Sequence, residues 1–222
     1  QLLQADAIRY GVEHFRRYRG RCMGTVVWQL NDIWPVASWA GIDYYGRWKA
    51  LHYAERKMFA PVMISCEEKG EMSERPYCIA EPAPIEKSAR LHIANETKEP
   101  VEGIVSWHLH RPDSSVILSG TQKVTVPALD GLWLEKMDFS EYEEREIHLS
   151  YSFAVNGQIV SQNTCLFTPP KHYNFMNPNL RWEKKGSRIT IYASAYAKNV
   201  EITGIDGDLW LSDNFFDMEA GE

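Results

Sequence analysis

The chain has 222 residues, of which 44% are hydrophobic and 24% are charged, a composition typical of a folded globular protein. It carries 24 lysines and arginines against 30 aspartates and glutamates, and the resulting net charge of -6 argues against a nucleic-acid-binding surface. No apolar run approaches the roughly 20 residues that a membrane-spanning helix needs, which argues against a membrane protein.

The four cysteines are scattered along the chain and form no CxxC pair, which argues against a structural zinc site and against a disulfide framework. Free thiols are typical of a reducing compartment, so they favour a cytoplasmic location, with a secreted or periplasmic protein as the alternative. Because the chain begins at Gln1 without a signal peptide, we expect it to be a piece of a longer protein. The cysteines are Cys22, Cys66, Cys78 and Cys165.

The first segment has the period of a helix, because apolar residues recur every three or four positions from Leu2 to Phe15. The run "GTVVWQL" at 24–30 is β-branched and almost wholly apolar, which is typical of a strand buried on both faces of a parallel sheet. A second helix is predicted from Trp48 to Met58, ended by Pro61.

A helix, a buried strand and a second helix form a piece of an α/β domain that cannot stand alone. A parallel strand needs neighbours on both edges, and no other run in this chain has the same pattern. A closed (β/α)₈ barrel takes about 250 residues, so residues 1–61 would supply only its final portion.

From about residue 62 the hydrophobic period changes from 3.6 to 2, the period of half-buried antiparallel strands. Val105, Trp107 and Leu109, for example, alternate with polar residues. Asn156-Gly157 lies between two such runs and predicts a hairpin with a type I′ turn. Short strands at this spacing predict an immunoglobulin-like sandwich over 62–171. The strands are expected around 62–67, 89–95, 105–109, 116–126, 131–137 and 147–153.

The segment "TPPKHYNFMNPN" at 168–179 is rich in proline and asparagine and predicts a linker. Strands are expected again near 180–184, 188–194, 199–204 and 208–212. They amount to about half of a sandwich, which typically needs about 100 residues, so we expect 172–222 to be a second, incomplete sandwich.

The stretch "WQLNDIWPVASWAGIDYYGRWKALHY" at 28–53 closely resembles the segment that closes the catalytic barrel of β-mannosidases of glycoside hydrolase family 2. "PPKHYNF" and "LSDNFFD" also look like parts of the C-terminal sandwiches of that family. The resemblance implies a mixed, mostly β fold, in which the terminal strand and helices of a (β/α)₈ barrel precede immunoglobulin-like antiparallel β-sandwich domains.

The resemblance also implies an exo-acting enzyme that removes β-mannosyl residues from the non-reducing end with retention of configuration. Retaining hydrolysis needs two carboxyl groups about 5 to 5.5 Å apart, and in the family both are glutamates on barrel strands that precede this segment. Glu13 and Glu55 lie on predicted helices and match neither motif, so no catalytic residue is expected in this chain. The implied partners are a β-mannoside substrate and the remainder of the catalytic domain, and neither a cofactor nor a metal is expected.

The candidate substrate-binding residues lie toward the C-terminal end of the predicted barrel strand and just after it. The resemblance places Trp28 beneath the sugar at the cleavage site, where an indole face stacks on a pyranose; the alternative is packing at the barrel mouth. Asn31 and Asp32 could bond a sugar hydroxyl or hold the loop, with the structural role favoured for Asp32. Trp34 could line the pocket or pack under the loop.

Other residues of the same stretch are expected to be structural. Trp39, Trp48 and Tyr53 are predicted to pack. Asp43 and Arg47, four residues apart across a turn, are predicted to form an ion pair.

Three other hypotheses stay open. His108 and His110 share one strand face and His148 falls on the polar phase of another strand, a pattern that could bind zinc. No carboxylate or thiol is evidently placed to complete that set, so a solvated face is favoured. A non-catalytic carbohydrate-binding or structural immunoglobulin-like module is the second, and another family 2 activity, such as that of a β-galactosidase or β-glucuronidase, is the third.

Overall fold

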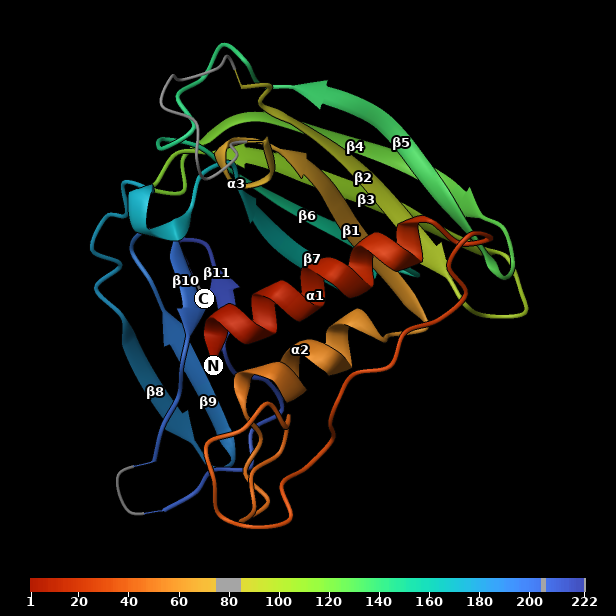
Figure 1. Ribbon diagram of the computed structural model, residues 1–222. Helices are drawn as coiled ribbons and strands as arrows, with labels where there is room; N and C mark the ends of the chain where they lie inside the picture. Colours follow the sequence, from red (N-terminus) through yellow and green to blue (C-terminus); the bar gives the residue numbers. More distant parts are fainter. Residues whose placement is uncertain (75–84, 205–206, 222) are drawn as a thin grey trace, which may run out of the picture.

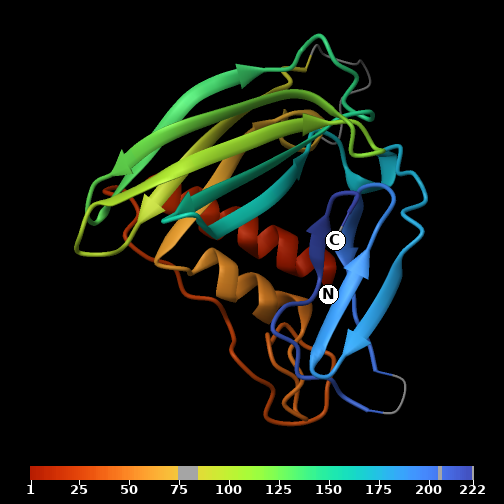
Figure 2. The same ribbon diagram turned by 180° about the vertical axis from the view of Figure 1, so that it is seen from behind.

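The computed structural model describes residues 1–74, 85–204 and 207–221, and its largest part is a sandwich of two antiparallel sheets (Figures 1 and 2). The first sheet has the order β1-β2-β5 and contains β1 (Val62–Lys69), β2 (Ser88–Asn95) and β5 (Asp130–Asp138). The second has the order β4-β3-β6-β7 and contains β3 (Val101–His110), β4 (Val116–Val126), β6 (His148–Val155) and β7 (Gln158–Leu166). All the strands predicted between 62 and 155 are confirmed.

The sandwich core forms because side chains alternate between the two faces of each strand. In the register of β3 against β6, Val105 lies opposite Phe153 and Leu109 lies opposite Leu149, and all four are fully buried. Within 105–110 and 148–153 the alternate residues are serines and histidines, which lie on the other face. The predicted period of 2 is therefore confirmed in these strands.

The turn between β6 and β7 also matches its prediction. Asn156 has φ 51° and Gly157 has φ 77°, so both central residues adopt the left-handed region that a type I′ turn requires.

Two helices, α1 (Leu2–Arg17) and α2 (Ala50–Met58), lie beside the first sheet, as Figure 1 shows. The residues that they bury include Ala5, Val12 and Leu51, which form a second core with Met63 of β1. The Arg16 guanidinium donates to the Met58 carbonyl at 2.7 Å, so α1 also holds the end of α2. Both predicted helices are confirmed, and only three residues separate α2 from β1.

The predicted strand at 24–30 is not formed. These residues are extended, but none of the described strands runs beside them, and Val26 is 92% exposed. The segment pairs at its end, where the carbonyls of Gln29 and Leu30 accept hydrogen bonds from the backbone of Gly41 and Ile42. The prediction was wrong for this chain because a parallel strand forms only between neighbouring strands.

The C-terminal part consists of two small ribbons, β8 (Arg181–Lys185) with β9 (Arg188–Tyr192), and β10 (Ala197–Val200) with β11 (Phe216–Met218). No strand forms at the predicted 208–212. β10 pairs with β11 instead, and Asp217 of β11 holds this pairing. Its carboxylate accepts hydrogen bonds from the Thr164 hydroxyl and from the backbone of Asn199, and it pairs with the Lys198 ammonium at 3.0 Å.

The predicted linker is packed rather than free. It contains the short helix η1 (Pro170–His172), and the next residue, Tyr173, is buried against Leu166 and Tyr196. The C-terminal part is therefore held against the sandwich by a small core of its own.

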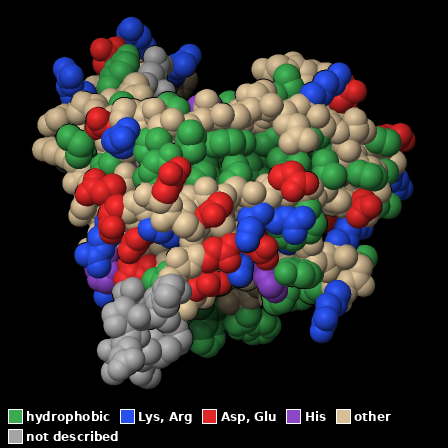
Figure 3. All heavy atoms as spheres, turned by 90° about the horizontal axis from the view of Figure 1, so that it is seen from above, with side chains coloured by type: hydrophobic (Ala, Val, Ile, Leu, Met, Phe, Trp, Pro, Cys, Tyr) green, Lys and Arg blue, Asp and Glu red, His purple; other side chains and the backbone are tan. Residues whose placement is uncertain are grey.

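Seen from above, hydrophobic side chains form a band between charged groups, over the side where β4 and β5 are the adjacent edges of the two sheets (Figure 3). Ile117 of β4 and Leu132 and Leu134 of β5 are partly buried and pack against the core from these strands. The sandwich core thus reaches the surface along its open edge.

The carboxyl group of Glu68 lies on the inward face of β1. Glu68 continues the inward-facing phase of Ile64 and Cys66 and is buried at the end of β1, where the Ser73 hydroxyl of α3 (Glu71–Glu74) donates to it at 3.4 Å. Burial, assisted by the nearby charge of Glu74, raises the pKa of Glu68 from 4.5 to about 7. The folded protein therefore favours the protonated form of this carboxyl.

We expect Glu68→Gln to stabilise the protein in alkaline solution. The pKa of Glu68 is higher in the folded protein than in the unfolded chain. The contribution of its protonated form to stability is therefore fully present below pH 4.5 and is lost as the pH rises to about 7. The variant should therefore gain on the order of 3 kcal/mol at about pH 8 and little at about pH 4. Urea denaturation at the two pH values measures this, with Glu67→Gln on the other face of β1 as the control. An equal gain at both pH values would contradict the assignment.

Candidate functional site

The tryptophan-rich stretch forms a folded loop between α1 and α2, here called the aromatic loop (residues 24–49). Its two arms are joined by backbone hydrogen bonds, including Asp32 N to Ile42 O at 3.0 Å, and Asn31 and Ile42 form an isolated parallel bridge. Ile42 also bridges to Trp48, just before α2 begins. The loop therefore has a defined shape although it contains no regular strand.

Asp32 lies inside this loop and holds it together. The residue is only 5% exposed, and its carboxylate pairs with the Lys49 ammonium at 3.0 Å. The Ser38 hydroxyl donates to its other oxygen and accepts from Ala40 N at 3.0 Å. The hydrogen bond from Ser38, and then the one from Lys49, lower the pKa of the Asp32 carboxyl. Asp32 thus has the structural surroundings that the sequence analysis favoured for it.

The other three candidates point outward. Trp28 is 69% exposed, Trp34 is 63% exposed and Asn31 is also exposed. The Asn31 side-chain amide donates to the Asp32 carbonyl at 3.1 Å, which leaves its own carbonyl oxygen facing away from that bond. The peptide bond between Trp28 and Gln29 is cis. The arrangement presents two indole faces and one amide to a ligand, which suits the apolar face and the hydroxyls of a sugar ring.

The residues predicted to be structural divide into two groups. Arg47 pairs with Asp43 at 2.6 Å, and Tyr53 is buried with its ring 5.3 Å from that of Trp48, so these predictions are confirmed. Trp39 is 59% exposed, so in this chain its indole does not pack as expected.

Sequence analysis missed the partners of Asp32. Lys49 lies 17 residues after Asp32 in the sequence, and only the folded loop shows that its ammonium pairs with the Asp32 carboxylate. A buried aspartate requires such a partner, so the signal was the need for a cation rather than the spacing.

The three histidines of the zinc hypothesis lie on one sheet face. The rings of His110 and His148 are stacked with centroids 5.1 Å apart, and the ring of His108 is 5.7 Å from that of His110. His110 and His148, but not His108, converge with Glu219, and this carboxylate is the one that the sequence did not reveal.

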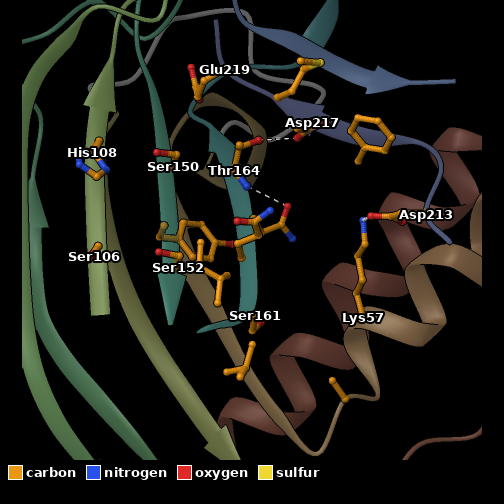
Figure 4. A pocket seen from close by; sticks show the side chains of 18 of the residues that line it. Lys57, Ser106, His108, Ser150, Ser152, Ser161, Thr164, Asp213, Asp217 and Glu219 are labelled. Carbon is orange, nitrogen blue, oxygen red and sulfur yellow. Dashed lines mark hydrogen bonds and ion pairs between the residues drawn. The ribbon is translucent and has the colours of Figure 1, made fainter. Parts of the chain in front are cut away.

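A large cavity opens beside this face, between the second sheet, the end of α2 and β11 (Figure 4). Its volume is about 860 Å³. Ser106 and His108 of β3, Ser150 and Ser152 of β6 and Glu219 are among the residues that line it. Polar and apolar side chains both line the cavity, and none of its described lining residues is a tryptophan, so it differs in character from the aromatic loop.

Among the described residues, Cys22, Cys66 and Cys165 are free, whereas Cys78 lies outside the described part of the chain. In the ranges 1–74, 85–204 and 207–221, no helix is long and apolar enough to cross a membrane.

Two protein families match the chain by sequence. The family described as Mannosidase Ig/CBM-like domain matches residues 87–172, and one described as Ig-fold domain matches residues 175–222. The beta-mannosidase of Mus musculus is 30% identical over 185 residues, which cover 80% of this chain and 19% of that protein. Beta-mannosidase A of Aspergillus oryzae is 47% identical over 68 residues, which cover 29% of this chain and 7% of that protein. The chain thus spans a minor part of the relatives that it matches.

Solved structures resemble the fold over the whole chain. A beta-D-mannosidase from Dictyoglomus thermophilum aligns with a TM-score of 0.77 and 20% identity, covering 99% of this chain and 26% of that one. The exo-chitosanase CsxA of Amycolatopsis orientalis aligns with a TM-score of 0.73 and 16% identity, covering 100% of this chain and 30% of that one. At these identities the likeness concerns the fold alone.

We expect Asp32→Asn to loosen the aromatic loop. The variant loses the charge that pairs with Lys49, so the amides of Gly41 and Ile42 should exchange with solvent faster, on the order of tenfold, in hydrogen-exchange measurements. Because the folded pKa of Asp32 lies below its ordinary value of 3.8, the carboxylate stabilises the loop above that pH. Acidification of the wild type below it should therefore also lower the protection of these amides, measured relative to their intrinsic exchange rate at the same pH.

Asp130→Asn, at the exposed start of β5, provides a control for the loss of one carboxylate. Unchanged exchange at Gly41 and Ile42 in Asp32→Asn would show that the buried carboxylate does not hold the loop.

Proposed function

The chain belongs to the β-mannosidases of glycoside hydrolase family 2, and we propose that it forms part of an exo-acting, retaining β-mannosidase. The enzyme would remove terminal β-D-mannose residues from the non-reducing ends of β-mannosides. Relatives from mouse and Aspergillus carry the name of this activity, and their similarity to the chain supports the proposal.

In this proposal residues 1–61 complete a catalytic (β/α)₈ barrel. The two packed helices with an extended apolar segment between them support it, since this is the order expected at the end of such a barrel. Val26 and Ile33 are 92% and 82% exposed, and the neighbouring barrel strands of the parent protein would cover such side chains. The segment 24–30 would become a strand only beside those neighbours.

The aromatic loop is the part of the chain that would meet the sugar, and it carries the proposal. Trp28 would form the floor of the pocket, and Trp34 and Asn31 would contribute to its wall. All three are exposed on a loop whose shape is set from inside by Asp32 and Lys49. We therefore assign Asp32 the role of holding these groups in place rather than of touching the sugar.

The two sandwiches, which we divide at 62–171 and 172–222, would have a structural role. The family matches to 87–172 and 175–222 support the division.

Glu13 is buried between Arg9 and Arg17 of its own helix, and Glu55 pairs with His52 at 3.0 Å. Both glutamates have local partners, which supports a catalytic pair contributed by the rest of the parent domain. The free thiols are in keeping with a reducing, cytoplasmic location.

Two other functions would be distinguished by substrate. A different family 2 glycosidase would prefer an aryl β-galactoside or an aryl β-glucuronide to an aryl β-mannoside. A non-catalytic module would bind mannan through the sandwich and would hydrolyse none of these three glycosides. A kcat/KM for the mannoside well above those for the other glycosides is the result that supports the proposal.

We expect Trp28→Ala in the full-length enzyme to lower kcat/KM on an aryl β-mannoside. Loss of the stacking surface should remove about 2 to 4 kcal/mol of transition-state stabilisation, as is typical of groups that position the reacting sugar. Steady-state kinetics of the variant and the wild type measure this loss.

Trp182→Ala is a matched control, because Trp182 of β8 is also 69% exposed but lies in the C-terminal hairpin. Its kcat/KM should equal that of the wild type. An unchanged kcat/KM in Trp28→Ala would remove the stacking role.

A further inference from the structure

Two histidines on adjacent strands meet a carboxylate from the end of the chain. His110 of β3 and His148 of β6 are register partners, and Glu219 directly follows β11. One ligand atom from each residue lies within 4.8 Å of the other two. The group thus joins the outer face of the sandwich to the C-terminal part.

The carboxylate of Glu219 faces one nitrogen of each of the two stacked rings. Its Oε1 is 2.8 Å from His148 Nε2, and its Oε2 is 3.9 Å from His110 Nδ1. Oε2 is buried and has no hydrogen-bond partner among the residues that the structure describes. A buried carboxylate oxygen without a partner is costly, and it faces a nitrogen at a distance too long for a hydrogen bond.

The outer nitrogen of each ring is held by a hydroxyl group. His148 Nδ1 is 2.7 Å from the Tyr173 hydroxyl, and His110 Nε2 is 2.8 Å from the Ser150 hydroxyl. Metal-binding histidines are oriented by such contacts from their second nitrogen. Because a hydroxyl can either donate or accept, each contact survives when the ring proton moves to the outer nitrogen. The nitrogens that face Glu219, His110 Nδ1 and His148 Nε2, can therefore become free to bind a cation without loss of a proton from either ring.

A fourth donor lies beside the same group. Ser114 has φ 67°, and its carbonyl oxygen is 3.1 Å from His110 Nδ1. Without a cation this carbonyl can only accept the proton of His110 Nδ1. With one, it is an oxygen ligand next to two imidazoles and a carboxylate.

The site is buried on one side and reachable on the other. The side chain of His148 is fully buried and that of His110 is 7% exposed, whereas that of Glu219 is 27% exposed. Glu219 and Ser150 also line the cavity of about 860 Å³ (Figure 4). An ion can thus enter from the cavity and be held on the sandwich face.

We propose that His110, His148 and Glu219 bind a zinc ion that fastens the C-terminal part to the sandwich. Two imidazoles and one carboxylate form a ligand set that zinc uses in proteins, whereas magnesium and calcium prefer oxygen ligands alone. Imidazole binds zinc in its neutral form, and the carboxylate adds one negative charge to the ligand set, which suits a divalent cation. The site does not depend on the proposed glycosidase activity.

The test is a zinc titration of the full-length protein, freed of metal with a chelator that is then removed by dialysis. Calorimetry should show that each protein chain binds one zinc ion at this site with micromolar or tighter affinity, and it should show no heat when magnesium is added. Glu219→Gln keeps the size of the side chain but not its charge, and it should weaken zinc binding at least about 100-fold. Tyr173→Phe keeps the buried ring and should weaken binding about 10-fold through His148.

His108→Gln is the matched control, because His108 lies on the same strand face but outside the group, and its zinc affinity should equal that of the wild type. Cobalt in place of zinc should give the intense visible bands of four-coordinate cobalt in the wild type and not in Glu219→Gln. Zinc should also raise the melting temperature of the wild type but not that of the variant, which separates metal binding from misfolding. Absence of heat in the wild type, equal affinity in Glu219→Gln, or an equal loss in His108→Gln would overturn the proposal.

Discussion

The alternation of side chains along β3 and β6 is the constraint on which the rest of the structure depends. The two strands pair so that Val105 meets Phe153 inside the sandwich while His110 meets His148 outside it. A slip of one residue would exchange the two faces, burying histidines in the core and exposing the apolar residues. The pairing that fills the core is therefore also the one that assembles the polar group at Glu219, and the two cannot be changed separately.

The aromatic loop reverses the usual distribution of side chains. The ion pair of Asp32 and Lys49 is inside, and the indoles of Trp28 and Trp34 are outside. Because a paired charge rather than packed rings sets the shape of the loop, the rings remain available for a ligand. Arg16 of α1 bonds to the end of α2 and thereby connects this loop, through the helices, with the first strand of the sandwich.

The sequence predicted those parts of the structure whose determinants are local. The period of 2 predicted β3 and β6, and Asn156-Gly157 predicted the turn that follows, because neighbouring residues decide both. The segment 24–30 has the composition of a buried strand but lacks partner strands here, so its pattern alone did not make it one. Lys49 and Glu219 were missed for a related reason, since each acquires its meaning from a residue brought close only by folding.

The ribbon of β8 and β9 has a consequence for how the molecule gives way. All five residues of β8 are exposed, most of β9 is only half-buried, and a two-stranded ribbon has little stability of its own. It is tied down at its base instead, where the backbone of Ser194 bonds to Pro178 and that of Ala193 bonds to Gly221. On heating or in the presence of a protease, the ribbon of β8 and β9 would therefore unfold first, from its turn toward its base, while the seven-stranded sandwich stays folded.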